Sequence, residues 1–149
     1  MANALDLLLG GKINAERPSK EVKIKRLSSK DVDFVVTVTA ITMDDFKHVQ
    51  EMNRKGSVLD EIAMNLMLLT YGVREFDPKL AENKERFDEI KKAYGVSTME
   101  KFLNKILLPG EISSLSMEII NISGFNDDMV EDVKRNRARW RDNTHLSFV

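Results

Sequence analysis

Apolar and polar residues alternate regularly between residues 34 and 41. A period of two in a β-branched run is typical of a strand. The side chains expected to face the core are Phe34, Val36, Val38 and Ala40. Residues 21–27 alternate charged side chains with valine and isoleucine, and residues 28–30 supply a turn. The pattern predicts a β-hairpin over residues 20–41, with the lysines of its first strand facing water and protecting its edge.

From Thr42 onward the apolar period becomes that of a helix. Thr42 with Asp45 is typical of a helix start, and Gly56 ends this first helix. The next predicted helix begins after Ser57, covers residues 58–70 and is the most apolar in the chain. Its apolar positions are Leu59, Ile62, Ala63, Leu66 and Met67, widened by Leu68 and Leu69. A helix with so wide an apolar face is expected in the middle of a bundle.

Two further helical regions follow. Asp77–Pro78 is typical of a helix start, and the charged residues 79–94 then predict a surface helix that ends at Gly95. Residues 97–125 predict a pair of helices, because the break at residues 108–110 interrupts a helical apolar period. Ser97 and Glu100 fit a capping box at the start of the first helix. The acidic side chain of Glu111 suits the start of the second helix, where the helix dipole is positive. A break this short predicts an αα-hairpin.

The chain continues after Phe125 with two aspartates that begin a last predicted helix. Its apolar residues are Met129, Val130 and Val133. The expected fold class is α+β, mostly α, with the N-terminal β-hairpin packed on a bundle of about five to six short helices. We expect a flexible N-terminal segment at residues 1–19, a single globular domain at residues 20–133 and a flexible, basic and polar C-terminal tail at residues 134–149.

Composition narrows the chemistry that the chain can support. A length of 149 residues with 42% hydrophobic residues suits one domain with a sizeable core. There is no cysteine for a disulfide, a thiolate nucleophile or a cysteine zinc site. His48 and His145 lie in no triad or metal-binding pattern, and the acidic pairs fall at helix starts, where they complement the dipole. We therefore expect no enzyme, no cofactor and no bound metal.

Charge and hydropathy address the compartment and the kind of partner. The net charge is −1, although the first 30 residues carry seven Lys and Arg against three acids. Those lysines have no interleaved aromatic residues, so a solvated edge strand is favoured over a nucleic-acid patch. No apolar run reaches the length of a membrane span. No basic segment precedes the N-terminal leucines, so the pattern does not predict a secretory signal. We expect a cytoplasmic protein with no membrane partner.

Two segments are candidates for partner binding. Leu7, Leu8 and Leu9 form either a frayed terminus that docks loosely on the body or a short apolar peptide that docks on a partner. Arg137, Trp140 and Arg141 lie in a tail that either stays solvated or becomes ordered on a partner, because Arg and Trp dominate interface hot spots. The eight methionines suit adaptable surfaces, but most lie at core spacing.

The order of several motifs resembles one family of phage proteins. The matching stretches are Leu7–Gly10, EVKIKRL at 21–27, Thr42–Asp45, LLTYGV at 68–73, Asp77–Pro78, Ala93–Gly95, LLPGEI at 107–112 and ISGF at 122–125. LLPGEI followed by ISGF is the most specific part. Over residues 5–133 the chain resembles the XkdN-like tail assembly chaperones of contractile-tailed phages and phage-like particles. The tail beyond Lys134 does not match.

This resemblance implies a non-enzymatic helper, made in the host bacterial cytoplasm and missing from the mature particle. It implies that the chain binds the tape-measure protein and keeps it soluble while tail-tube subunits polymerise around it. The tail-tube protein and a longer, frameshifted form of the chain are further implied partners. Two alternatives stay open: a structural or adaptor subunit of a phage-like particle, and a small nucleic-acid-binding regulator.

Overall fold

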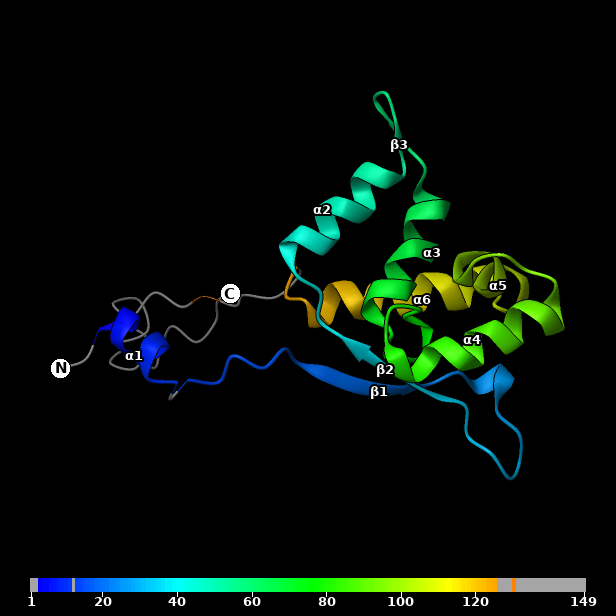
Figure 1. The fold of residues 1–149 in the computed structure, drawn as a ribbon, viewed down its shortest axis with the longest axis horizontal. Helices are drawn as coiled ribbons and strands as arrows, with labels where there is room; N and C mark the ends of the chain where they lie inside the picture. The colour runs from blue at the N-terminus through cyan, green and yellow to red at the C-terminus, as the bar shows by residue number, and fades with distance from the viewer. Residues whose placement is uncertain (1–2, 12, 126–129, 131–149) are drawn as a thin grey trace, which may run out of the picture.

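The computed structural model describes residues 3–11, 13–125 and 130, and its elements are arranged as Figure 1 shows. The predicted hairpin is confirmed: β1 (Ser19–Lys23) pairs antiparallel with β2 (Val35–Thr39), in a register that runs from Ser19 opposite Thr39 to Lys23 opposite Val35. Val36 and Val38 are buried as predicted, whereas Phe34 is only partly buried. A 3-10 helix that the sequence did not indicate, η1 (Lys25–Leu27), follows β1.

The most apolar helix, α3 (Glu61–Gly72), contacts α2 (Met43–Met52), α5 (Met99–Ile106), α6 (Pro109–Ile122) and the 3-10 helix η2 (Arg74–Phe76). Leu68 and Leu69 have no exposed surface. The predicted central position of this helix is therefore confirmed, and Figure 1 shows α6 crossing behind it. Burial of leucines on several sides of one helix is the main stabilising contribution expected in such a bundle.

The start of α3 differs from the sequence-based prediction. Residues 58–59 form a short strand, β4 (Val58–Leu59), paired with β3 (Arg54–Lys55) across a turn in which Gly56 has φ +62°. Asp60 is the N-cap, because its side chain accepts a hydrogen bond from the amide of Ala63 at 3.1 Å. The prediction of a helix from residue 58 was wrong, and so was the placement of Ile62 in the core, since its side chain is 72% exposed.

The charged helix lies on the surface as predicted, but it begins later. α4 (Ala81–Tyr94) has no buried residue and ends at Gly95, whose φ is +64°. Asp77 and Pro78 belong to a turn instead of a helix start. The side-chain amide of Asn83 donates to the carbonyl oxygens of Arg74 and Asp77, which stabilises this turn ahead of α4.

The pair α5 and α6 does not form the predicted αα-hairpin. Both helices pack chiefly on α3 and make few contacts with each other, so the bundle separates them. Figure 1 shows α6 lying across the page while α5 is seen nearly end-on. The predicted cap at Ser97 is also wrong by one residue: Thr98 accepts the amide hydrogen bond of Lys101 at 3.1 Å.

The N-terminal residues contain a helix that was not predicted, α1 (Ala4–Gly10). Asn3 and Asp6 form its capping box. Met129 and Val133 of the predicted last helix lie outside the described residues, and Val130 is exposed and not helical. The division into a domain at residues 20–133 and two tails stays a prediction. Within the described residues, no helix is long and apolar enough to cross a membrane.

Candidate partner-binding site

The predicted contact residues Leu7, Leu8 and Leu9 lie on α1 and are 43%, 59% and 87% exposed. Leu5, on the same helix, is 68% exposed, and α1 has no buried residue. Figure 1 shows α1 apart from the bundle, at the end of the extended segment that leads into β1. Leu5, Leu8 and Leu9 share one helical face by their spacing. This face is apolar and accessible in the described structure.

The other predicted contacts, Arg137, Trp140 and Arg141, lie outside the described residues. Their role stays a prediction. His145 also lies there, whereas His48 is exposed on α2, with its ring centroid 6.1 Å from that of Tyr71. Where the structure is described, no group of three or more His, Cys, Asp or Glu side chains could hold a metal ion.

A groove that the sequence did not indicate lies between the β1–η1 segment and α6. Its volume is about 900 Å³. Val22 and Ile24 contribute from the hairpin side, and Leu115 contributes from α6. Gly110, Ser113 and Ser114 place small side chains along the helix, while Leu108 and Met117 are about half exposed. The groove therefore combines an apolar lining with room for another chain.

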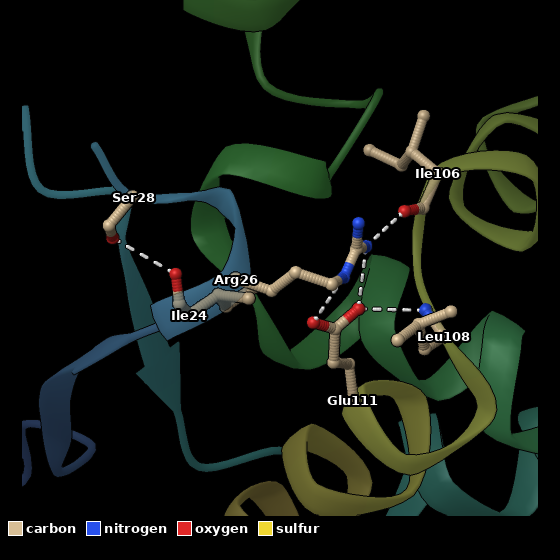
Figure 2. Close-up of polar contacts among 6 residues, drawn as sticks. All are labelled: Ile24, Arg26, Ser28, Ile106, Leu108 and Glu111. Atoms are coloured by element: carbon tan, nitrogen blue, oxygen red, sulfur yellow. Dashed lines mark hydrogen bonds and ion pairs between the residues drawn. The ribbon is translucent and has the colours of Figure 1, made fainter.

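Arg26 and Glu111 both line the groove, and Figure 2 shows the polar contacts between them. Its guanidinium donates from Nε to Glu111 Oε2 at 2.9 Å, and from Nη2 to Glu111 Oε1 at 2.8 Å. The same Nη2 donates to the carbonyl oxygen of Ile106 at 2.6 Å. A bidentate pair of this kind has a fixed geometry as well as charge. It holds η1 against the start of α6.

The two charged groups shift each other's pKa. The hydrogen bonds from Arg26 and from the amide of Leu108, which lies 2.7 Å from Glu111 Oε1, lower the pKa of the Glu111 carboxyl. The hydrogen bond to Glu111 raises the pKa of the Arg26 guanidinium. Both groups therefore stay charged across the neutral range.

A second ion pair links β1 to α6 farther along. The ammonium of Lys20 lies 2.5 Å from Glu118 Oε2. The two ion pairs hold the hairpin against α6 at two places and leave the groove open between them. Arg26 and Glu111 are 85 residues apart in the chain. A sequence reading had no local pattern that could pair them; the one available signal was the cluster of basic residues in the first strand.

The described residues thus present an accessible apolar helix and a groove between the β1–η1 segment and α6. Residues 5–135 match the family model of the phage XkdN-like tail assembly chaperone protein. The chain therefore belongs to this family of phage tail assembly chaperones, which confirms the resemblance inferred from its motifs.

A solved structure supports the fold. The crystal structure of the protein YqbN is similar with a TM-score of 0.62, at 20% sequence identity, covering 85% of this chain and 100% of that one. At this identity the likeness concerns the fold alone. A search of curated proteins gave no significant match.

Proposed function

We propose that this chaperone binds the tape-measure protein of its phage and keeps it soluble until tail-tube subunits polymerise around it. The observation that carries the proposal is α1, whose leucines are exposed and whose residues contribute nothing to the core. Membership of the chaperone family supports a non-enzymatic role in assembly.

The physical basis is the behaviour of short helices and apolar seams. A helix of seven residues is marginal alone in water, because helices shorter than about 12–15 residues rarely repay their nucleation. Contact with a partner would stabilise α1 and cover its leucines. A long helical tape measure with an apolar seam aggregates if that seam stays exposed, and an amphipathic helix can cover such a seam by helix-in-groove packing.

Co-expression with the tape-measure protein tests the proposal. The wild-type chain should raise the fraction of tape measure in the supernatant, and the two proteins should co-purify. The double variant Leu8→Ser/Leu9→Ser should bind at least about tenfold more weakly, since burying each leucine contributes about 1.5–3 kcal/mol. The matched control is Val58→Ser/Ile62→Ser, whose side chains are 68% and 72% exposed on another part of the molecule.

Two results would contradict this function. One is a tape measure that is no more soluble with the wild-type chain than without it. The other concerns the finished particle: an assembly chaperone should be missing from purified particles, whereas a structural or adaptor subunit should appear there in fixed stoichiometry by mass spectrometry. The same co-purification would identify the tail-tube protein or a longer form of this chain as additional partners.

A further inference from the structure

The outer edge of β1 has free backbone groups. In an antiparallel pair, hydrogen-bonded residue pairs alternate with non-hydrogen-bonded pairs. The amide of Ile24 donates to the carbonyl of Phe34 at 2.9 Å, and the amide of Ala40 donates to the carbonyl of Pro18 at 2.9 Å. The hydrogen-bonded pairs repeat every two residues along the register, so the backbone N–H and C=O groups of Lys20 and Val22 also point toward β2. The backbone groups of Ser19, Glu21 and Lys23 therefore point away from it.

The backbone hydrogen bonds of β2 show the same alternation. Thr37 lies across from Glu21, and its amide donates to Glu75 Oε1 at 2.7 Å instead of to β1. Val38 also forms a bridge with Val73, so η2 and the segment before it cover the outer edge of β2. Within the described residues, no hydrogen bond occupies the outward backbone groups of Ser19, Glu21 or Lys23. The sheet has two strands and one uncovered edge.

The groove lies at this uncovered edge. Lys23 belongs both to the edge and to the groove lining, together with Val22 and Ile24. Across from them, α6 presents Gly110 and Ser114, and a methyl group added at Gly110 would meet nothing within 4 Å. Small side chains on the helix leave space for the side chains of a third strand, and Leu108 and Met117 offer apolar contacts on α6.

We propose that β1 and this groove bind an extended peptide segment of another protein, which adds to the sheet as a third strand. Outward groups two residues apart repeat about every 6.8 Å, which matches the repeat of any extended chain. Such strand addition takes its affinity from main-chain hydrogen bonds and its specificity from pockets for alternate side chains. The site is separate from α1, and the inference does not depend on which protein supplies the segment.

Charge selects the chemistry of the segment. Residues 20–26 carry Lys20, Lys23, Lys25 and Arg26 against Glu21. Lys25 forms no ion pair in the described part of the chain, whereas the other three cations are paired. Two copies of this edge would bring like charges together, which disfavours pairing between copies. The unpaired Lys25 favours an acidic residue at one end of the ligand, and the apolar groove lining favours apolar residues at alternate positions.

The experiment uses the full chain and the synthetic peptide Glu-Glu-Val-Thr-Val-Thr-Val-Glu-Glu as the probe. Amide hydrogen exchange is followed by NMR with and without the peptide. The amides of Glu21 and Lys23 should exchange rapidly in the free protein and about tenfold or more slowly when the peptide is bound. The amides of Val22 and Ile24 should be protected in both states, because they already bond to β2.

Matched variants isolate the two parts of the site. Lys23→Pro removes the outward N–H as well as the charge, and it should weaken binding by about tenfold more than Lys23→Ala, which removes the charge but keeps the N–H. Ser114→Trp should fill the groove and weaken binding by a similar factor, whereas Asn104→Trp, at an exposed position on α5 outside the groove, should not. The comparison of Ser114→Trp with Asn104→Trp tests the groove even if the proline variant unfolds.

Four results would overturn strand addition. The first is a dissociation constant for the wild-type chain above about 1 mM. The second is binding without protection of Glu21 and Lys23, which would indicate a ligand held by side chains only. The third is equal binding by Ser114→Trp and Asn104→Trp. A peptide methylated at alternate backbone nitrogens should not bind, and equal affinity for it would also contradict the proposal.

Discussion

The contact between α3 and α6 depends on the absence of a side chain at Gly72. A Cβ built at this position would lie 2.6 Å from both Cγ1 and Cδ1 of Ile119, and 2.7 Å from its Cγ2. Carbon atoms prefer about 3.5–4.0 Å. Ile119 has no exposed surface, and two of the three atoms are close to its own backbone, so rotation of the side-chain end cannot relieve the overlap. Gly72→Ala should therefore force the two helices apart.

The expected magnitude is the difference of two effects. Overpacking a core costs about 1–3 kcal/mol. Alanine gains at most about 1 kcal/mol over glycine inside a helix, and less at Gly72, the last residue of α3. The free energy of unfolding should fall by about 1–2 kcal/mol. For a chain of this size, this lowers Tm by about 2–8 °C.

Urea unfolding of a double-mutant cycle measures this effect. Ile119→Ala alone should destabilise by about 2–5 kcal/mol, because it leaves a cavity. It also removes all three atoms that approach Gly72, so the double variant should be about 1–2 kcal/mol more stable than the sum of the single effects. Gly110→Ala is the control, since a methyl group there meets nothing within 4 Å. A Gly72→Ala variant as stable as the wild type, or effects that simply add, would refute the packing argument.

Two further predictions concern polar contacts. Because the pKa of Glu111 is lowered in the folded state, its contribution to stability should be complete above the unfolded value of about 4.3 and lost as pH falls below it. The stability difference between wild type and Glu111→Gln, measured by urea unfolding, should shrink from pH 6 to pH 3, and a constant difference would contradict the assignment. Asp60→Ala should lower the free energy of unfolding by about 1 kcal/mol through loss of the α3 cap, whereas Asp60→Asn should cost less. Equal losses in both variants, read by thermal unfolding, would show that the cap hydrogen bond is not the cause.

Local patterns predicted the parts of the fold that depend on one segment at a time. The alternation at Val36 and Val38 identified the buried face of β2, because side chains on a strand alternate between faces. The wide apolar face predicted for residues 58–70 placed this helix in the middle, since so much apolar surface needs several neighbours. The many charged residues of α4 correctly predicted an exposed helix.

Errors arose where several starts were compatible with the same residues. Ser57, Asp60, Ser97 and Thr98 are all suitable caps, and the choice among them depends on packing and on the β3–β4 turn. The short break at Leu108–Gly110 suggested an αα-hairpin, but both helices pack chiefly on α3 instead of on each other. The helix α1 did have a signal, the Asn3–Asp6 capping box, in a segment that was predicted to be flexible.

The sequence by itself determined the family, the mostly helical α+β class and the exposed leucines as a candidate contact, because these follow from motifs and short-range periodicity. Only the tertiary structure decided where a second contact surface forms. The groove joins β1 to a helix more than 80 residues later, through Arg26 and Glu111. The free edge of β1 likewise depends on which strand β2 pairs with and on what covers the opposite side. Such features depend on distances between remote segments, which no local pattern of residues encodes.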